Sequence, residues 1–75
     1  MKNWNETNKE LMIKQVNETY QFSKNYSTAE DAAYNVRLGY ENNPEWFSFV
    51  VDDLDAFEED VKRIINETFL QLMNE

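Results

Sequence analysis

The stretch from Asp52 to Met73 is the strongest folding signal in the chain, because its apolar residues recur at three- and four-residue steps. This spacing places them along one stripe of an α-helix, and that stripe needs a partner surface to bury it. Charged residues occupy the positions between and belong on the solvated side. The apolar positions are Leu54, Phe57, Val61, Ile64, Ile65, Phe69 and Leu72. The sequence therefore predicts a long amphipathic helix at the carboxyl end.

A first helix is predicted to start near Thr7, which forms a capping-box pattern with Glu10. In this pattern the two side chains satisfy amides that a helix start leaves unpaired. A strand over Val16 to Phe22 is a competing interpretation, because Val16, Tyr20 and Phe22 are an even number of positions apart and would lie on the same face of a strand. We favour the helix, because it accounts for the apolar stripe. The stripe consists of Leu11, Met12, Ile13, Val16 and Tyr20.

A second helix is predicted from about Thr28, with Ser27 and Glu30 as its capping box. Small side chains on its inner face allow a neighbouring helix to approach closely. The inner positions are Ala29, Ala32, Ala33, Val36 and Tyr40. We expect this helix to end at Gly39, since glycine readily adopts the left-handed conformation of a helix end.

A third helix start is marked by Asn43-Pro44, because proline at a first helical position loses no hydrogen bond. One unbroken helix from Pro44 to Met73 is an alternative to a break at Asp52 and Asp53. We favour the break, because short polar residues compete there for backbone amides. Phe47 and Val50 are expected to lie in the core.

Together these elements predict an all-α fold, a small three- to four-helix bundle with a long C-terminal amphipathic helix. We expect one helical domain over residues 1–75, with residues 1–6 frayed. With 41% hydrophobic and 15% aromatic residues the chain can build one compact core. A core of this size leaves modest stability, so a homodimer is open as an alternative state.

The charge and the missing residue types narrow the function. A net charge of −8 repels nucleic acid phosphates and anionic lipids, so we expect no direct nucleic acid binding and no membrane binding. The chain lacks Cys and His, which removes the commonest nucleophile, general base and metal ligands. We therefore expect no enzyme activity, no cofactor and no metal. No apolar run has the length of a signal peptide or a membrane span, and we expect a cytoplasmic location.

Six carboxylates between residues 52 and 60 form an acidic block: Asp52, Asp53, Asp55, Glu58, Glu59 and Asp60. Acids favour helix starts, and Glu58 with Lys62 and Glu59 with Arg63 have the spacing of helical ion pairs. A basic protein partner is the second interpretation. A calcium loop is disfavoured, because core residues interrupt the alternate ligand positions and the central glycine is missing.

Trp46 is the strongest candidate for an exposed anchor, because it lies among aromatic residues with an acidic neighbour, Glu45. Large rigid side chains of this kind are typical of protein interfaces. Trp4 is a second candidate, or it packs on the first helix as a hydrophobic staple.

The function predicted from the sequence is a small acidic, non-enzymatic protein-binding module, a regulator or inhibitor of a basic, nucleic-acid-binding partner. Its predicted contact residues are Trp46 and the acidic block. The alternative is an obligate homo-oligomer, in which the helices of several copies complete one core and the acids serve solubility.

Overall fold

The computed structural model describes residues 1–69, and its architecture is the predicted all-α bundle. Two very short strands form a small parallel sheet beside the helices. The elements are β1 (Lys2–Asn3), the 3-10 helix η1 (Trp4–Glu6), α1 (Lys9–Tyr20), α2 (Phe22–Asn25), α3 (Ala29–Asn42), the 3-10 helix η2 (Pro44–Trp46), β2 (Phe49–Val50) and α4 (Leu54–Thr68).

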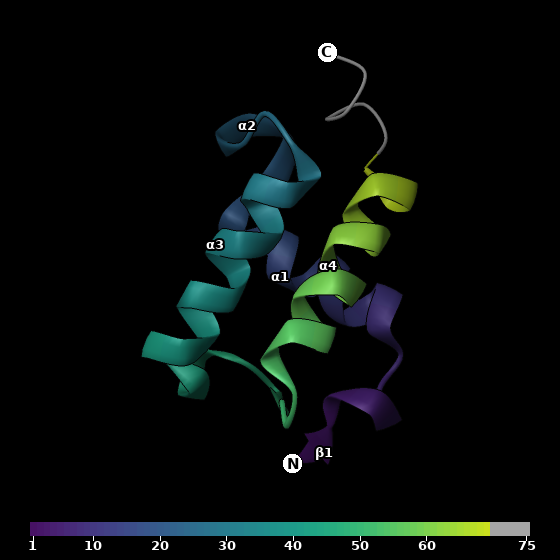
Figure 1. The fold of residues 1–75 in the computed structure, drawn as a ribbon, viewed down its shortest axis with the longest axis vertical. Helices are drawn as coiled ribbons and strands as arrows, with labels where there is room; N and C mark the ends of the chain where they lie inside the picture. The colour runs from purple at the N-terminus through teal and green to yellow at the C-terminus, as the bar shows by residue number, and fades with distance from the viewer. Residues whose placement is uncertain (70–75) are drawn as a thin grey trace.

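The helices α3 and α4 lie side by side, with α1 packed on α4 behind them (Figure 1). The predicted inner face of α3 is confirmed, since Ala29, Ala32, Ala33 and Val36 are all buried. The predicted apolar stripe is buried at Phe57, Val61, Ile64 and Ile65 and half-buried at Leu54 and Phe69. Its side chains dominate the core, whose largest fully buried members are Phe22, Phe57, Ile13, Ile64, Ile65, Val36 and Val61. α4 ends at Thr68, with Phe69 as its C-cap, before the predicted end at Met73. The predicted residues beyond Phe69, including Leu72 and Met73, lie outside the described range.

Both predicted capping boxes differ from the observed helix starts by one residue. The cap of α1 is Asn8, whose Oδ1 accepts a hydrogen bond from the Leu11 amide at 3.1 Å. Thr7 instead donates its hydroxyl to the Trp4 carbonyl at 2.7 Å. The cap of α3 is Thr28, whose hydroxyl oxygen accepts from the Asp31 amide at 3.0 Å. Asn and Thr are both favoured N-cap residues, so the kind of cap was predicted correctly and its position was wrong by one residue.

The expected end of the second helix at Gly39 is wrong, since α3 continues to Asn42. Gly39 does not adopt a positive φ, so its role is not conformational. The hydroxyl of Tyr20, from α1, packs directly over it, and a Cβ at residue 39 would overlap that oxygen. The glycine therefore allows close packing between α1 and α3, and a larger residue at this position would displace the Tyr20 side chain.

The break near Asp52 and Asp53 is confirmed, because Asp53 caps α4 by accepting from the Ala56 amide at 3.1 Å. Upstream of it the chain is a 3-10 turn and a strand, where we expected helix. In the strand β2, alternation buries Phe49 and leaves Val50 42% exposed, so the expectation of a buried Val50 is wrong. Phe47 is buried as expected.

The expectation of a frayed amino terminus is also wrong for the residues that follow Met1. β1 pairs in parallel with β2, with Lys2 opposite Phe49 and Asn3 opposite Val50. Trp4 is only 2% exposed, and its ring centroid lies 4.9 Å from those of both Phe49 and Phe57. Burial of this large side chain holds the first residues against the bundle.

Within residues 1–69, no helix has both the length and the apolar character needed to cross a membrane.

Candidate functional site

The first two acids of the acidic block are used at the start of α4. Asp53 is its N-cap, and Asp52 accepts a hydrogen bond from the side-chain amide of Asn3. This second contact links the loop before α4 to β1. Both carboxylates therefore have structural roles where the chain enters the helix, as the helix-start interpretation of the block anticipated.

Two further acids of the block bind Arg37, which extends from α3. Its Nη1 lies 2.6 Å from Asp55 Oδ1 and 2.9 Å from Glu58 Oε1. Its Nε donates to Glu41 Oε1 at 2.9 Å, one helical turn further along α3. Arg37 is thus the centre of a charge cluster that ties α3 to α4. The predicted pairing of Glu58 with Lys62 is replaced by this long-range contact.

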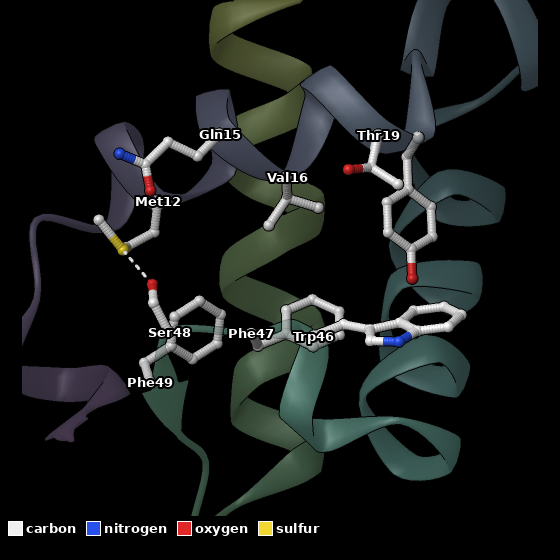
Figure 2. A pocket seen from close by; sticks show the side chains of 9 residues that line it. Met12, Gln15, Val16, Thr19, Trp46, Phe47, Ser48 and Phe49 are labelled. Carbon is white, nitrogen blue, oxygen red and sulfur yellow. Dashed lines mark hydrogen bonds between the residues drawn. The ribbon is translucent and has the colours of Figure 1, made fainter.

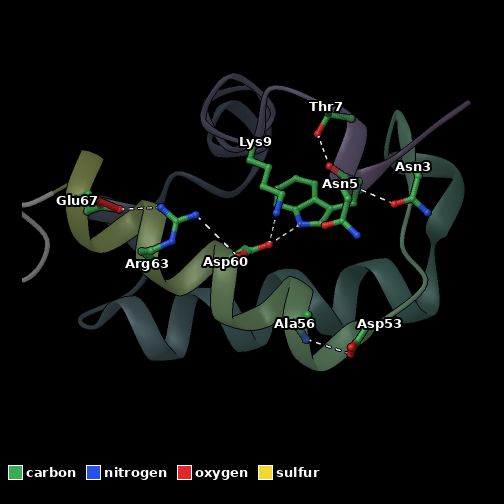
Figure 3. A network of polar contacts seen from close by, with 10 residues as sticks. Asn3, Asn5, Thr7, Lys9, Asp53, Ala56, Asp60, Arg63 and Glu67 are labelled. Atoms are coloured by element: carbon green, nitrogen blue, oxygen red, sulfur yellow. Dashed lines mark hydrogen bonds and ion pairs between the residues drawn. The ribbon is translucent and has the colours of Figure 1, made fainter.

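Asp60 is the centre of a second network, between α4 and the amino terminus (Figure 3). Its Oδ2 accepts from Lys9 Nζ at 2.7 Å and from the indole N–H of Trp4 at 3.0 Å. Arg63 lies 3.8 Å from its other oxygen and also pairs with Glu67 at 2.9 Å, in place of the predicted pairing with Glu59.

The pKa of the Asp60 carboxyl reflects these contacts. Partial burial raises this pKa, but the hydrogen bonds from Lys9 and Trp4 and the nearby positive charges outweigh burial and hold it below its usual value. Asp60 is therefore a stably ionised structural residue.

Within residues 1–69, Glu59 is the one acid of the block without a hydrogen bond or ion pair to the rest of the chain. It borders a shallow hollow of about 240 Å³ between α3 and α4, together with Glu30, Asp55, Glu58 and Lys62. No set of three or more acidic side chains in the described part of the chain is arranged to hold a metal ion. The block is thus largely engaged in internal contacts.

Trp46 lies elsewhere, at the end of η2, and its side chain is 67% exposed. The 3-10 turn places it there because Pro44 starts the turn and the Phe47 amide closes it on the Pro44 carbonyl at 3.1 Å. Phe47 turns inward from the next position. Trp46 borders a groove of about 400 Å³, which is the larger of the two hollows described here.

The groove runs between α1 and residues 46–49 (Figure 2). Its lining residues are Met12, Gln15, Val16, Thr19, Tyr20, Trp46, Phe47, Ser48 and Phe49. Most of these contribute apolar surface. Polar atoms lie among them, and the Ser48 hydroxyl contacts the Met12 sulfur at 3.6 Å. Among residues 1–69, no charged side chain lines the groove.

The groove has a firm aromatic base. The rings of Phe47 and Phe49 lie 5.7 Å apart, and Tyr40 packs against Phe47 at 5.4 Å. The Tyr40 hydroxyl also accepts from the Val51 amide at 2.9 Å, which fixes the chain just after β2. A preformed surface loses little entropy when a ligand binds.

The structure thus separates the predicted contact residues into two places. Trp46 belongs to the groove, and the acidic block lies at the start of α4, where Asp55, Glu58 and Glu59 border the other hollow. Sequence reasoning missed the α1 wall, in which Gln15 and Thr19 join the apolar stripe. The available signal was the mixture of Met12 and Val16 with polar neighbours, which also fits an ordinary helix packed on a core.

No family model, no curated protein and no solved structure matches this chain.

Proposed function

We propose that this chain is a small acidic, non-enzymatic protein-binding module whose partner is a basic protein. The observation that carries the proposal is the exposed Trp46 beside a preformed apolar groove. Tryptophan is enriched among the residues that dominate binding energy, especially beside pockets that exclude water. Leaving it in solvent brings no benefit to folding, so a binding role accounts for its position.

The charge of the chain supports a basic partner. A net charge of −8 speeds association with a positive surface and disfavours acidic competitors. A regulator or inhibitor of a nucleic-acid-binding protein is the narrower form of this proposal. Because five acids of the block are engaged within the chain, we assign the main contact to the groove and a steering role to the acids.

The alternative is an obligate homo-oligomer. The exposed apolar side chains of Leu11, Trp46 and Val50 support it, because a second copy could cover them. Against it, the core closes within one copy, since Phe22 and Phe57 are fully buried by residues of the same chain. Light scattering after size exclusion separates the two. A mass near 9.0 kDa at all concentrations favours the module, and a dimer that persists on dilution favours the oligomer.

Affinity capture from the cells that make the protein tests the proposal. The wild type is compared with Trp46→Ala and with Tyr34→Ala, which removes another half-exposed aromatic ring from α3, away from the groove. We expect a basic protein to be captured by the wild type and Tyr34→Ala and to be lost with Trp46→Ala. Capture that is equal with all three baits contradicts the proposal.

A further inference from the structure

The dimensions of the groove indicate what kind of segment it accepts. Its α1 wall runs from Met12 to Tyr20, a rise of roughly 12 Å or about two helical turns. A helix that presents apolar residues at positions i, i+4 and i+7 covers about 10 Å along its axis, which matches this length. The volume of about 400 Å³ accommodates a few such side chains and little more.

The polar atoms of the groove lie at its sides, where they would meet the polar sides of a bound amphipathic helix. Gln15 and Thr19 lie on the α1 wall and Ser48 on the opposite side, around an apolar base (Figure 2). An occupant with one apolar face and polar sides satisfies this arrangement, whereas a wholly apolar segment would cover the Gln15 amide and the Thr19 hydroxyl without offering them hydrogen-bond partners.

Charge decides between a second copy of this chain and a different protein. Two copies each carry −8, so self-association through this face is opposed by their mutual repulsion. The charged residues that adjoin the lining residues in sequence are two acids, Glu18 and Glu45, and one base, Lys14. The field around the groove therefore favours a cationic occupant.

We infer that the groove between α1 and residues 46–49 binds a basic amphipathic helix of a partner protein, with apolar side chains on Val16, Phe47 and Trp46 and with Lys or Arg at the rim. This inference rests on the proposed function and adds to it the location of the site and the chemistry of the ligand. The acidic block contributes only to the long-range field.

Isothermal titration with a synthetic peptide tests this inference. The peptide has about 15 residues, Leu at helical spacing and Lys elsewhere, and a Leu/Glu peptide of the same pattern is its counterpart. The groove is altered by Thr19→Arg, which adds bulk and positive charge to an exposed position on the α1 wall. The matched control is Asn66→Arg, the same change of charge at an exposed position of α4 that does not line the groove.

We expect the Leu/Lys peptide to bind the wild type and Asn66→Arg within about threefold of each other, and to bind Thr19→Arg and Trp46→Ala at least about tenfold more weakly. Equal binding to all four proteins overturns the groove as the site that binds a basic helix. Equal binding of the Leu/Glu peptide, or binding of neither peptide, overturns the basic helix as occupant. A dimer that Thr19→Arg converts to monomer overturns it in favour of a second copy. The proposed function itself is tested separately by the affinity-capture experiment, in which equal capture with all three baits contradicts it.

Discussion

The indole N–H of Trp4 donates to Asp60 Oδ2 at 3.0 Å, a contact between residues 56 positions apart in the sequence. Lys9 binds the same oxygen and lies 5.6 Å from the centre of the Trp4 ring. The Asp60 carboxylate of α4 thereby binds both Trp4, which precedes α1, and Lys9, the first residue of α1. This relationship explains why the amino terminus packs on the bundle.

Substitution by alanine should lower the stability of the fold strongly at Trp4 and hardly at all at Trp46. Trp4→Ala empties a buried site against Phe49 and Phe57 and is expected to lower the free energy of unfolding by about 3–5 kcal/mol. Trp46→Ala removes a largely exposed ring and is expected to change it by less than about 0.5 kcal/mol. Urea unfolding followed by circular dichroism measures both. Similar losses in the two variants contradict the assigned positions.

Substitutions at Asp60 should separate its hydrogen bond from its charge. Asp60→Ala leaves the buried indole N–H of Trp4 without an acceptor and is expected to cost about 1–3 kcal/mol of unfolding free energy. Asp60→Asn keeps an acceptor and loses the charge, so we expect a smaller cost of about 1 kcal/mol or less. The same urea titrations test this order, and an Asn variant less stable than the Ala variant would be inconsistent with it.

The ionisation of Asp60 should also make stability depend on pH. The folded pKa lies below its usual value, because the contacts of Lys9, Trp4 and Arg63 outweigh the opposing effect of burial. Folding then favours the ionised form, and the resulting stability is present above the unfolded pKa of about 3.9 and is lost as the pH falls through the folded pKa. We expect the difference in unfolding free energy between wild type and Asp60→Asn to shrink as the pH is lowered from about 6 to about 2. A difference that stays constant over this range argues against the mechanism.

Gly39→Ala should destabilise the fold although alanine is the better helix former. Alanine gains about 1 kcal/mol in an ordinary helix interior, but overpacking costs about 1–3 kcal/mol, and here the new methyl group meets the Tyr20 hydroxyl. We expect a net loss of up to about 2 kcal/mol. In the Tyr20→Phe background that oxygen is gone, so the loss should be smaller. A double-mutant cycle measures the coupling, and additive effects would mean that the two residues do not press on each other.

The predictable part of the fold is the part that local sequence determines. The stripe of Phe57, Val61, Ile64 and Ile65 and the cap at Asp53 act within one helix, so periodicity and cap chemistry found them. The segment that contains Phe49 was misassigned because a short apolar run fits a helix or a strand equally well. Its strand partner, Lys2–Asn3, lies far away in sequence, and the pairing leaves no local signal.

Long-range contacts explain the other differences. Arg37 and Lys9 look like solvated cations in sequence, and only the packing of α3 and the amino terminus on α4 makes them partners of Asp55, Glu58 and Asp60. In the candidate site, the exposure of Trp46 agrees with the expectation of an exposed anchor. The groove beside it combines α1 with residues 46–49, and no pattern along the chain specifies that two such segments form one surface.

The most direct test of the groove as the binding site is a ¹⁵N-labelled NMR titration with the Leu/Lys peptide, because the two indole N–H signals are an internal comparison. Trp46 lies exposed at the groove, and Trp4 is buried with its N–H bound to Asp60. We expect the Trp46 indole signal to shift progressively, together with the amides of Gln15 and Thr19, while the Trp4 signal stays in place. A titration in which the amides around Glu59 and Lys62 shift and the Trp46 signal does not would contradict it.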